Sequence, residues 1–203
     1  MDNNAAWVVT THDWAISVDE DHLEHIRQNP AIYAQGGLRH MMLEVLAYAA
    51  DEATAAGRVG TATVTVRPDG SVSIRDDGRG TDTRRTPQGH IIRKPVMATR
   101  DVRFFDNPDR SVLPDGLPRW GMSVVAALSS TLIHQNRRAS GGWIQTYHHG
   151  MPATELIEIA DDGTTGTTVT FTLETPTDTH RSLRPSDRSA FSSLRVSLDD
   201  APS

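Results

Sequence analysis

The sequence of 203 residues contains no cysteine. It therefore cannot form a disulfide framework, a thiolate nucleophile or a cysteine-ligated zinc site, and it is compatible with a reducing cytoplasm. Lysine is almost as scarce, because Lys94 is the only one and every other Lys or Arg position holds arginine. This scarcity excludes any mechanism that needs two lysine side chains.

Long apolar runs and excess positive charge are also missing. No stretch approaches the length of a membrane span, and residues 1–4 lack the basic region of a signal peptide. The formal net charge of -6 argues against a general nucleic-acid surface. We therefore expect a soluble, cytoplasmic protein that binds no membrane and, by itself, no nucleic acid. The length suits one α/β domain with its own core.

Periodicity predicts the elements of the first half of the chain. Ser17 and Glu20 have the spacing of a capping box, which predicts a short helix that Pro30 ends. Apolar residues at helical spacing predict a longer helix from 38 to 57. Apolar and polar residues then alternate on either side of a Pro-Asp-Gly turn, which predicts a β-hairpin over 62–74.

The second half is predicted to be mostly antiparallel β-structure. Residues 76–118 show little periodicity and predict a lid or another functional loop. A helix near 121–130 precedes strands near 131–136, 143–148, 154–160 and 167–173. We divide the chain into an N-terminal extension (1–16), one domain (17–175) and a polar, flexible tail (176–203). This order predicts an α+β fold: a two-layer α/β sandwich with a mixed, mostly antiparallel sheet and helices on one face.

Four segments resemble the N-terminal ATPase domain of the DNA gyrase B proteins, which are members of the GHKL superfamily. They are residues 27–33, the helix 37–53, the Asp-Asp-Gly-Arg-Gly run at 76–80 and the Thr-Gly-Thr run at 165–167. Their spacing agrees with that family to within a few residues. The resemblance implies a GHKL (Bergerat-type) sandwich with a pocket of the kind that binds ATP.

The resemblance implies a catalytic role for the long helix. Glu44 would be the general base that activates a water molecule. Tyr48 and Asp51 follow it at i+4 and i+7, so the three side chains share one helical face and are our candidate catalytic residues. The alternative interpretation is that Glu44 and Asp51 belong to the solvated side of an amphipathic helix.

The resemblance also implies a base-binding site. Asp76 would accept a hydrogen bond from the exocyclic amine of adenine, and Thr167 would support the same edge of the base. Arginines could bind phosphate groups in pairs of hydrogen bonds. The candidate ligand-binding residues are Asp76, Gly78, Arg79, Trp120, Arg119, Arg138 and Thr167.

The half of the site that should hold the triphosphate departs from the family pattern. Tyr48 replaces an asparagine that binds magnesium, and a phenol is a poor neutral ligand for that ion. The lid reads Gly-Leu-Pro-Arg-Trp-Gly at 116–121 where the family has Gly-Leu-His-Gly-Val-Gly. Pro118 has no amide hydrogen, Trp120 fills space, and Asp82 adds negative charge near the base. We therefore predict no metal site.

Three functions remain open. The first is a stand-alone gyrase B-like domain that has lost ATP hydrolysis and uses its pocket for a small organic molecule, as a cyclase or isomerase with carboxylate acid/base chemistry and no required cofactor. The second is a sensor or regulator that binds ATP or ADP. The third is a non-catalytic module that binds a partner protein or a gyrase-directed antibiotic. A homodimer is left open, and only the first function would make the chain an enzyme.

Overall fold

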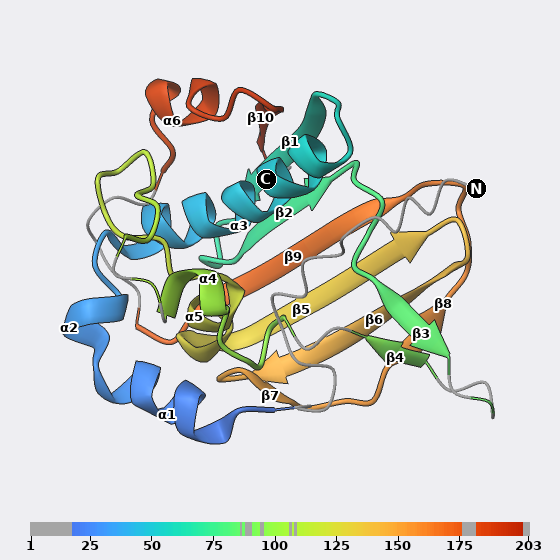
Figure 1. Cartoon of the computed structure of the whole chain (residues 1–203), viewed down its shortest axis with the longest axis horizontal. Helices are drawn as coiled ribbons and strands as arrows, with labels where there is room; N and C mark the ends of the chain where they lie inside the picture. Colours follow the sequence, from blue (N-terminus) through green and yellow to red (C-terminus); the bar gives the residue numbers. More distant parts are fainter. Residues whose placement is uncertain are drawn as a thin grey trace, which may run out of the picture.

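One eight-stranded sheet with helices on one face organises the chain in the computed structural model (Figure 1). The structure describes residues 18–85, 87, 91–93, 96–105, 107, 109–175 and 182–200. The predicted N-terminal extension at 1–16 lies outside the described residues. The α+β fold with a mixed, mostly antiparallel sheet is confirmed.

The strand order is β10-β1-β2-β9-β5-β6-β7, with β8 paired to β6. All pairs in this sheet are antiparallel except β1 with β10, which is parallel. The strands are β1 (Gly60–Val66), β2 (Val72–Asp76), β5 (Ser129–Arg138), β6 (Gly141–His148), β7 (Met151–Pro152), β8 (Ile157–Ile159), β9 (Gly166–Leu173) and β10 (Leu194–Asp200), while β3 (Thr83–Arg85) and β4 (Ile91–Arg93) form a separate hairpin. The predicted hairpin is β1–β2, and the predicted meander corresponds to β5, β6 and β9 with short strands between them.

The helices are α1 (Glu20–Gln28), α2 (Pro30–Tyr33), α3 (Gly37–Ala55), α4 (Val102–Phe105), α5 (Met122–Ala127) and α6 (Pro185–Ser189). The first helix begins at Glu20, and its N-cap is Asp19, whose carboxylate accepts the His22 N–H at 3.1 Å. Ser17, which the capping box placed at this end, lies outside the described residues. An aspartate satisfies the free amide as well as a serine does, so local spacing alone chose the wrong cap.

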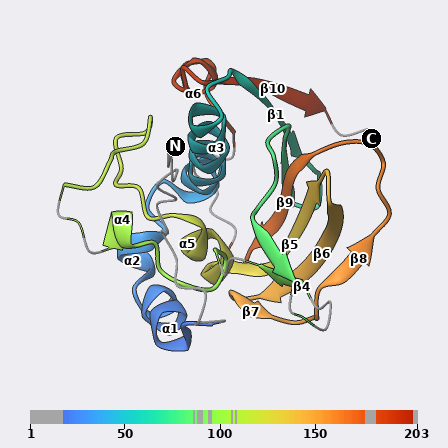
Figure 2. The same cartoon turned by 45° about the vertical axis from the view of Figure 1, so that its right-hand side comes forward.

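The core lies between α3 and the sheet. Leu43 and Leu46 of α3 are fully buried, and they belong to the same cluster as Ile74 and Phe171 of the sheet. In β1 the burial alternates residue by residue, which is why the sequence period of two predicts it correctly. Figure 2 shows the helices on one side of the sheet and its other face uncovered by any of them. No helix in the described ranges is both long and apolar enough to cross a membrane.

The prediction of a flexible tail at 176–203 is wrong for residues 182–200. They form α6 and β10, and β10 pairs with β1 along its whole length. The Asp187 carboxylate is buried and accepts two hydrogen bonds from Arg39 of α3, at 2.6 and 2.8 Å. The polar composition of this segment predicts disorder. The contact that orders the segment cannot be seen in the local sequence, because Arg39 lies 148 residues away from Asp187.

Asp187→Ala should destabilise the protein strongly, because it leaves the Arg39 guanidinium buried without its partner. Removing one member of a buried pair costs about 3–5 kcal/mol. Urea unfolding followed by circular dichroism measures the loss. The matched control is Glu24→Gln, which removes a carboxylate paired with Arg27 on the exposed side of α1 and should leave the midpoint nearly unchanged. Equal midpoints for Asp187→Ala and the unaltered chain would show that α6 is not anchored in this way.

Candidate functional site

A cavity of about 80 Å³ lies where β2, β9 and α3 meet. We call it the Asp76 cavity; its lining residues are Tyr48, Ala49, Glu52, Asp76, Arg79, Gly80, Thr81, Asp82 and Thr167. Four of the candidate residues predicted from the sequence, Tyr48, Asp76, Arg79 and Thr167, therefore come together here. The volume is well below the roughly 300–1,000 Å³ typical of ligand pockets, so it has room for one small ring or head group.

Asp76 ends β2 and lines the cavity, and protein donors engage one of its two carboxylate oxygens. Its Oδ1 accepts the N–H groups of Gly78 at 2.8 Å and Thr167 at 3.2 Å. No described residue donates to Oδ2. Burial raises the pKa of Asp76 to about 6, assisted by the nearby Glu52 and Asp77 carboxylates and opposed by the two backbone hydrogen bonds. Oδ2 is thus left without a donor from the described residues, and the carboxyl group titrates near pH 6.

Two glycines allow the backbone to come close around Asp76. Gly166 has φ of 127°, and a Cβ there would overlap the Asp76 carbonyl oxygen. Gly80 has φ of 79°, and its Cβ would lie 2.5 Å from the side-chain oxygen of Asn136, which accepts the Thr81 N–H. The Thr-Gly-Thr and Asp-Asp-Gly-Arg-Gly runs therefore contain glycine because no other residue fits these positions without strain.

The two arginines at the rim of the Asp76 cavity are paired with carboxylates. Arg79 Nε lies 2.6 Å from Glu52, and Arg138 donates to Asp82 at 2.9 Å and to the Gly80 carbonyl. The Arg79 side chain is 64 % exposed, so its pairing is weak and exchangeable with solvent. The sequence predicts both arginines as phosphate ligands; in this structure they neutralise the acidic rim.

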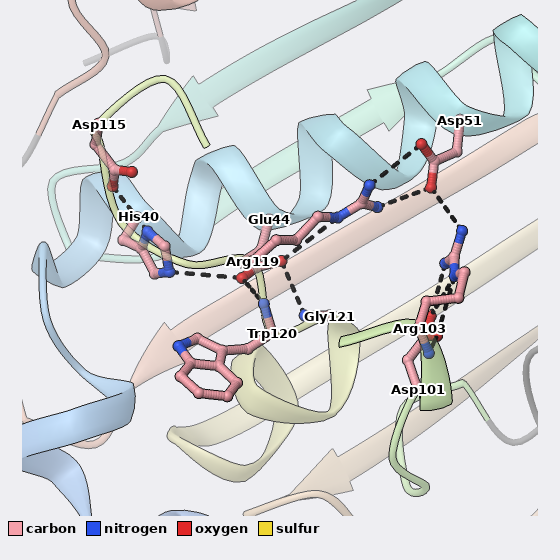
Figure 3. Close-up of polar contacts among 9 residues, drawn as sticks. All are labelled: His40, Glu44, Asp51, Asp101, Arg103, Asp115, Arg119, Trp120 and Gly121. Atoms are coloured by element: carbon pink, nitrogen blue, oxygen red, sulfur yellow. Dashed lines mark hydrogen bonds and ion pairs between the residues drawn. The ribbon is translucent and has the colours of Figure 1, made fainter. Parts of the chain in front are cut away.

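Glu44 lies outside the Asp76 cavity and is completely buried. Its two oxygens accept the N–H groups of Trp120 at 2.5 Å and Gly121 at 2.9 Å (Figure 3). These amides belong to the lid loop, which we define as residues 111–121. In the predicted role, Glu44 would have a free oxygen for a water molecule. Here the carboxylate instead attaches the lid loop to α3.

His40 reinforces this attachment from one turn earlier on α3. Its Nε2 lies 3.5 Å from Glu44, and its Nδ1 lies 2.7 Å from Asp115 of the lid loop. Burial alone would lower the pKa of His40, but the hydrogen bonds to Asp115 and Glu44 outweigh it and raise the pKa to about 9. A protonated imidazole therefore joins two carboxylates, one on the helix and one on the lid loop.

Asp51 is held by two guanidinium groups. Arg119 of the lid loop donates to it at 2.9 and 3.2 Å, and Arg103 of α4 donates at 3.0 Å (Figure 3). Arg103 also pairs with the buried Asp101 at 2.6 Å. The candidate catalytic carboxylate and the candidate ligand-binding Arg119 thus satisfy each other, and a second link joins the lid loop to α3.

The side chain of Trp120 points away from the Asp76 cavity, contrary to our expectation. It is buried in an aromatic cluster, with ring centroids 4.8 Å from Tyr33 and 5.4 Å from Phe105, and the Arg110 guanidinium lies 4.2 Å from its centre. With its amide bound to Glu44, the ring is directed into the core. Tyr48, by contrast, does line the cavity, and burial raises the pKa of its phenol, which stays neutral.

A larger cavity, of about 460 Å³, lies at the N-terminal end of α3. Its lining residues are Arg27, Pro30, Ala34, Gly37, Met41, Ala127, Leu128, His149, Leu173, Glu174 and Thr175. None of the candidate site residues is among them. Its lining is mainly apolar, and Arg27 already donates to the His149 carbonyl at 2.7 Å. Of these two cavities, only the smaller one is lined by candidate residues predicted from the motifs.

Comparison with known proteins establishes the family. Residues 33–177 match the model of the histidine kinase-, DNA gyrase B-, and HSP90-like ATPases. The DNA gyrase B protein of Streptomyces coelicolor is 33 % identical over 162 residues, which cover 77 % of this chain and 23 % of that protein. The DNA gyrase B protein of Haloferax volcanii is 35 % identical over 159 residues, covering 73 % and 25 %. The chain belongs to this ATPase family and is homologous to the ATPase domain of gyrase B.

The solved structures agree on the fold. The topoisomerase IV ATP-binding domain of Francisella tularensis, in complex with a small molecule inhibitor, superposes with a TM-score of 0.59 at 22 % identity, covering 77 % of this chain and 44 % of that one. The chain spans about a quarter of the length of the gyrase B relatives it matches. The resemblance predicted from the motifs is confirmed at the level of family and fold.

The residues at the family's magnesium position do not fit that ion. Tyr48 offers a phenol with a raised pKa, whereas Mg²⁺ prefers carboxylate, carbonyl or water oxygens in octahedral geometry. The nearby carboxylate of Asp51 is held by two guanidinium groups, and both oxygens of Glu44 are bound to amides. Within the described ranges, no three His, Asp or Glu side chains cluster closely enough to hold a metal ion.

Sequence reasoning missed several residues of this network. His40 could have been found from its position, because it lies four residues before Glu44 and must share its helical face. No sequence pattern pointed to Arg103, Asp101 or Asp115, because they lie in a segment without periodicity. Only the folded lid loop brings them to α3.

The protein should lose stability as the pH rises from 6.5 through 9. The pKa of His40 is about 9 in the folded chain, above its ordinary value of 6.5. The stabilisation from the charged imidazole is therefore fully present below pH 6.5 and is lost as the pH rises through 9. The free energy of unfolding should fall by up to about 3 kcal/mol. Urea unfolding at several pH values measures it, and His40→Gln should remove the dependence. A flat profile in the unaltered chain, or the same slope in His40→Gln, would contradict this.

Proposed function

We propose that this gyrase B-like domain no longer hydrolyses ATP and that its Asp76 cavity binds a small organic molecule carrying an N–H or O–H donor. The observation that carries the proposal is the engagement of Glu44: both of its oxygens accept lid amides and its side chain is completely buried, so it presents no solvent-facing oxygen to activate water. The occupied amides of Trp120 and Gly121 are also unavailable to a phosphate group, and Pro118 never had one to offer.

Recognition of the ligand rests on Asp76. Asp76 lines the cavity, its Oδ2 receives no hydrogen bond from a described residue, and Tyr48 provides an apolar wall with a neutral phenol. The topoisomerase IV ATP-binding domain that shares this fold was solved in complex with a small molecule inhibitor, which supports an organic ligand for this chain. The ligand needs no cofactor and no metal ion.

For a reaction of the cyclase or isomerase type in this cavity, we assign the acid/base role to Asp76 rather than to Glu44 or Asp51. A carboxyl group with a pKa of about 6 is suited to exchange a proton at neutral pH. Its Oδ2 is the oxygen from which the proton would move. The competing occupant is ADP or ATP, because the same geometry suits an adenine ring; Arg79 and Arg138 would then have to leave their carboxylates to meet the phosphates.

Steady-state phosphate release should show no magnesium-dependent ATP hydrolysis above the buffer background. Tyr48→Asn should not restore it, because Glu44 and Asp51 remain held by the lid loop and the arginines. A gyrase B ATPase domain serves as the positive control. Turnover that requires magnesium and disappears in Glu44→Ala would overturn the proposed loss of hydrolysis.

Adenosine is a suitable probe for the Asp76 cavity, because its exocyclic amine is the donor that the carboxylate should accept. Binding measured by calorimetry should weaken below pH 6, by up to about tenfold per pH unit, since protonation removes the acceptor. Asp76→Asn should bind more weakly and lose this pH dependence. The matched control is Glu24→Gln, because Glu24 is an exposed carboxylate of α1 that neither lines the cavity nor contributes to the pKa of Asp76.

ATP and ADP should bind no more tightly than adenosine. In the half of the pocket where the family binds phosphates, the lid amides of Trp120 and Gly121 are bound to Glu44 and Arg119 is bound to Asp51, so none of them is free for a phosphate group. The alternative function, a regulator that binds ATP or ADP, would be favoured if a nucleotide bound at least tenfold more tightly than adenosine and this difference depended on Arg138. Equal affinities of Asp76→Asn and the unaltered chain for adenosine would remove Asp76 from the site.

A further inference from the structure

The outer edge of β10 pairs with no strand in the parts of the chain that the structure describes. This strand is the first of the sheet, β1 pairs with it on one side, and no described strand lies on the other (Figure 2). The Ser193 carbonyl accepts the Gly60 N–H, so residues 195, 197 and 199 direct their backbone groups to β1. Val196 and Leu198 therefore direct their N–H and C=O groups outward, ready to pair with another strand.

The side chains of β10 are sorted between its two faces. Val196 and Leu198 lie on the helix side, in register with Ala62 and Val64 of β1, yet Leu198 is 47 % exposed. Arg195 and Asp199 lie on the opposite, uncovered face. Four residues along a strand is roughly 13 Å, so these two charges cannot meet within one chain. Neither makes an ion pair within the described part of the chain.

We propose that β10 is a homodimer surface, on which two copies of this chain pair their β10 strands antiparallel about a twofold axis at Ser197. Arg195 then lies opposite the partner subunit's Asp199, and the reverse pair forms at the other end. On the other face, Val196 lies opposite the partner subunit's Leu198, which covers the exposed apolar side chain. The outward backbone groups of Val196 and Leu198 form hydrogen bonds with their counterparts.

Charge complementarity selects this register. A symmetric antiparallel pair keeps the helix side of both sheets on the same face. Because side chains alternate between the two faces, the register can shift only in steps of two residues. A shift in either direction places Arg195 opposite a residue other than Asp199 and separates the two charges. The surface is therefore self-complementary in one arrangement, as a twofold interface requires. The proposal is independent of what the Asp76 cavity binds.

Charge reversal tests the interface directly. Sedimentation velocity over a concentration series should show a monomer–dimer equilibrium for the unaltered chain. Arg195→Asp and Asp199→Arg should each weaken dimerisation by at least about tenfold, because each places like charges opposite one another at both ends. An equimolar mixture of the two variants should restore the dimer, since every pair across the interface is then of opposite charge.

Two further variants complete the test. Leu198→Pro removes an outward N–H that β1 does not use and should also abolish the dimer, while circular dichroism reports an intact fold. Arg75→Asp makes the same charge change on the uncovered face of β2 and should leave the dimer unchanged. A chain that stays monomeric at all concentrations, a dimer unaffected by both charge reversals, or a mixture that fails to reassociate would each overturn the proposal.

Discussion

The bond between the Glu44 carboxylate and the lid amides is the contact on which the rest of the site depends. It holds the lid loop against α3 and directs the Trp120 ring into the aromatic cluster. It also brings Arg119 to Asp51 and Asp115 to His40. A buried carboxylate with no partner would be costly, so the lid loop gains its position by satisfying Glu44.

The two halves of the family's pocket therefore differ in how their charges are compensated. On the lid side, histidine and arginine side chains of the same chain neutralise the carboxylates, which are thus satisfied without a metal ion or a phosphate. On the base side, Asp76 is desolvated and receives only backbone N–H groups, so its pKa rises and one oxygen remains free. In this structure Glu44 and Asp51 are therefore bound by groups of the chain itself, whereas Asp76 is the carboxylate to which we assign ligand recognition.

The C-terminal segment changes what the domain can offer as a surface. Arg39 and Asp187 fix α6 to α3, and this position allows β10 to extend the sheet beyond β1. This edge strand carries an exposed Leu198, and its Arg195 and Asp199 form no ion pair with another described residue. Many sheets instead avoid association with short or covered edges. The sheet edge and the Asp76 cavity involve different strands, so the proposed dimer and the proposed ligand site can be tested by separate mutations.

Local pattern determined the elements and the base-side motifs. Periods of 3.6 and 2 located α3, the β1–β2 hairpin and the meander, because each of these signals lies within one short segment. Asp76 and Thr167 are 91 residues apart, so their place side by side was expected from the family resemblance and not from local pattern. The tertiary structure alone decided how charges are paired. His40 and Asp115 are 75 residues apart, and Arg39 and Asp187 are 148 apart. Ion pairs form where folding brings opposite charges together out of water. The spacing of residues within one segment does not indicate which distant charges will meet in the folded chain.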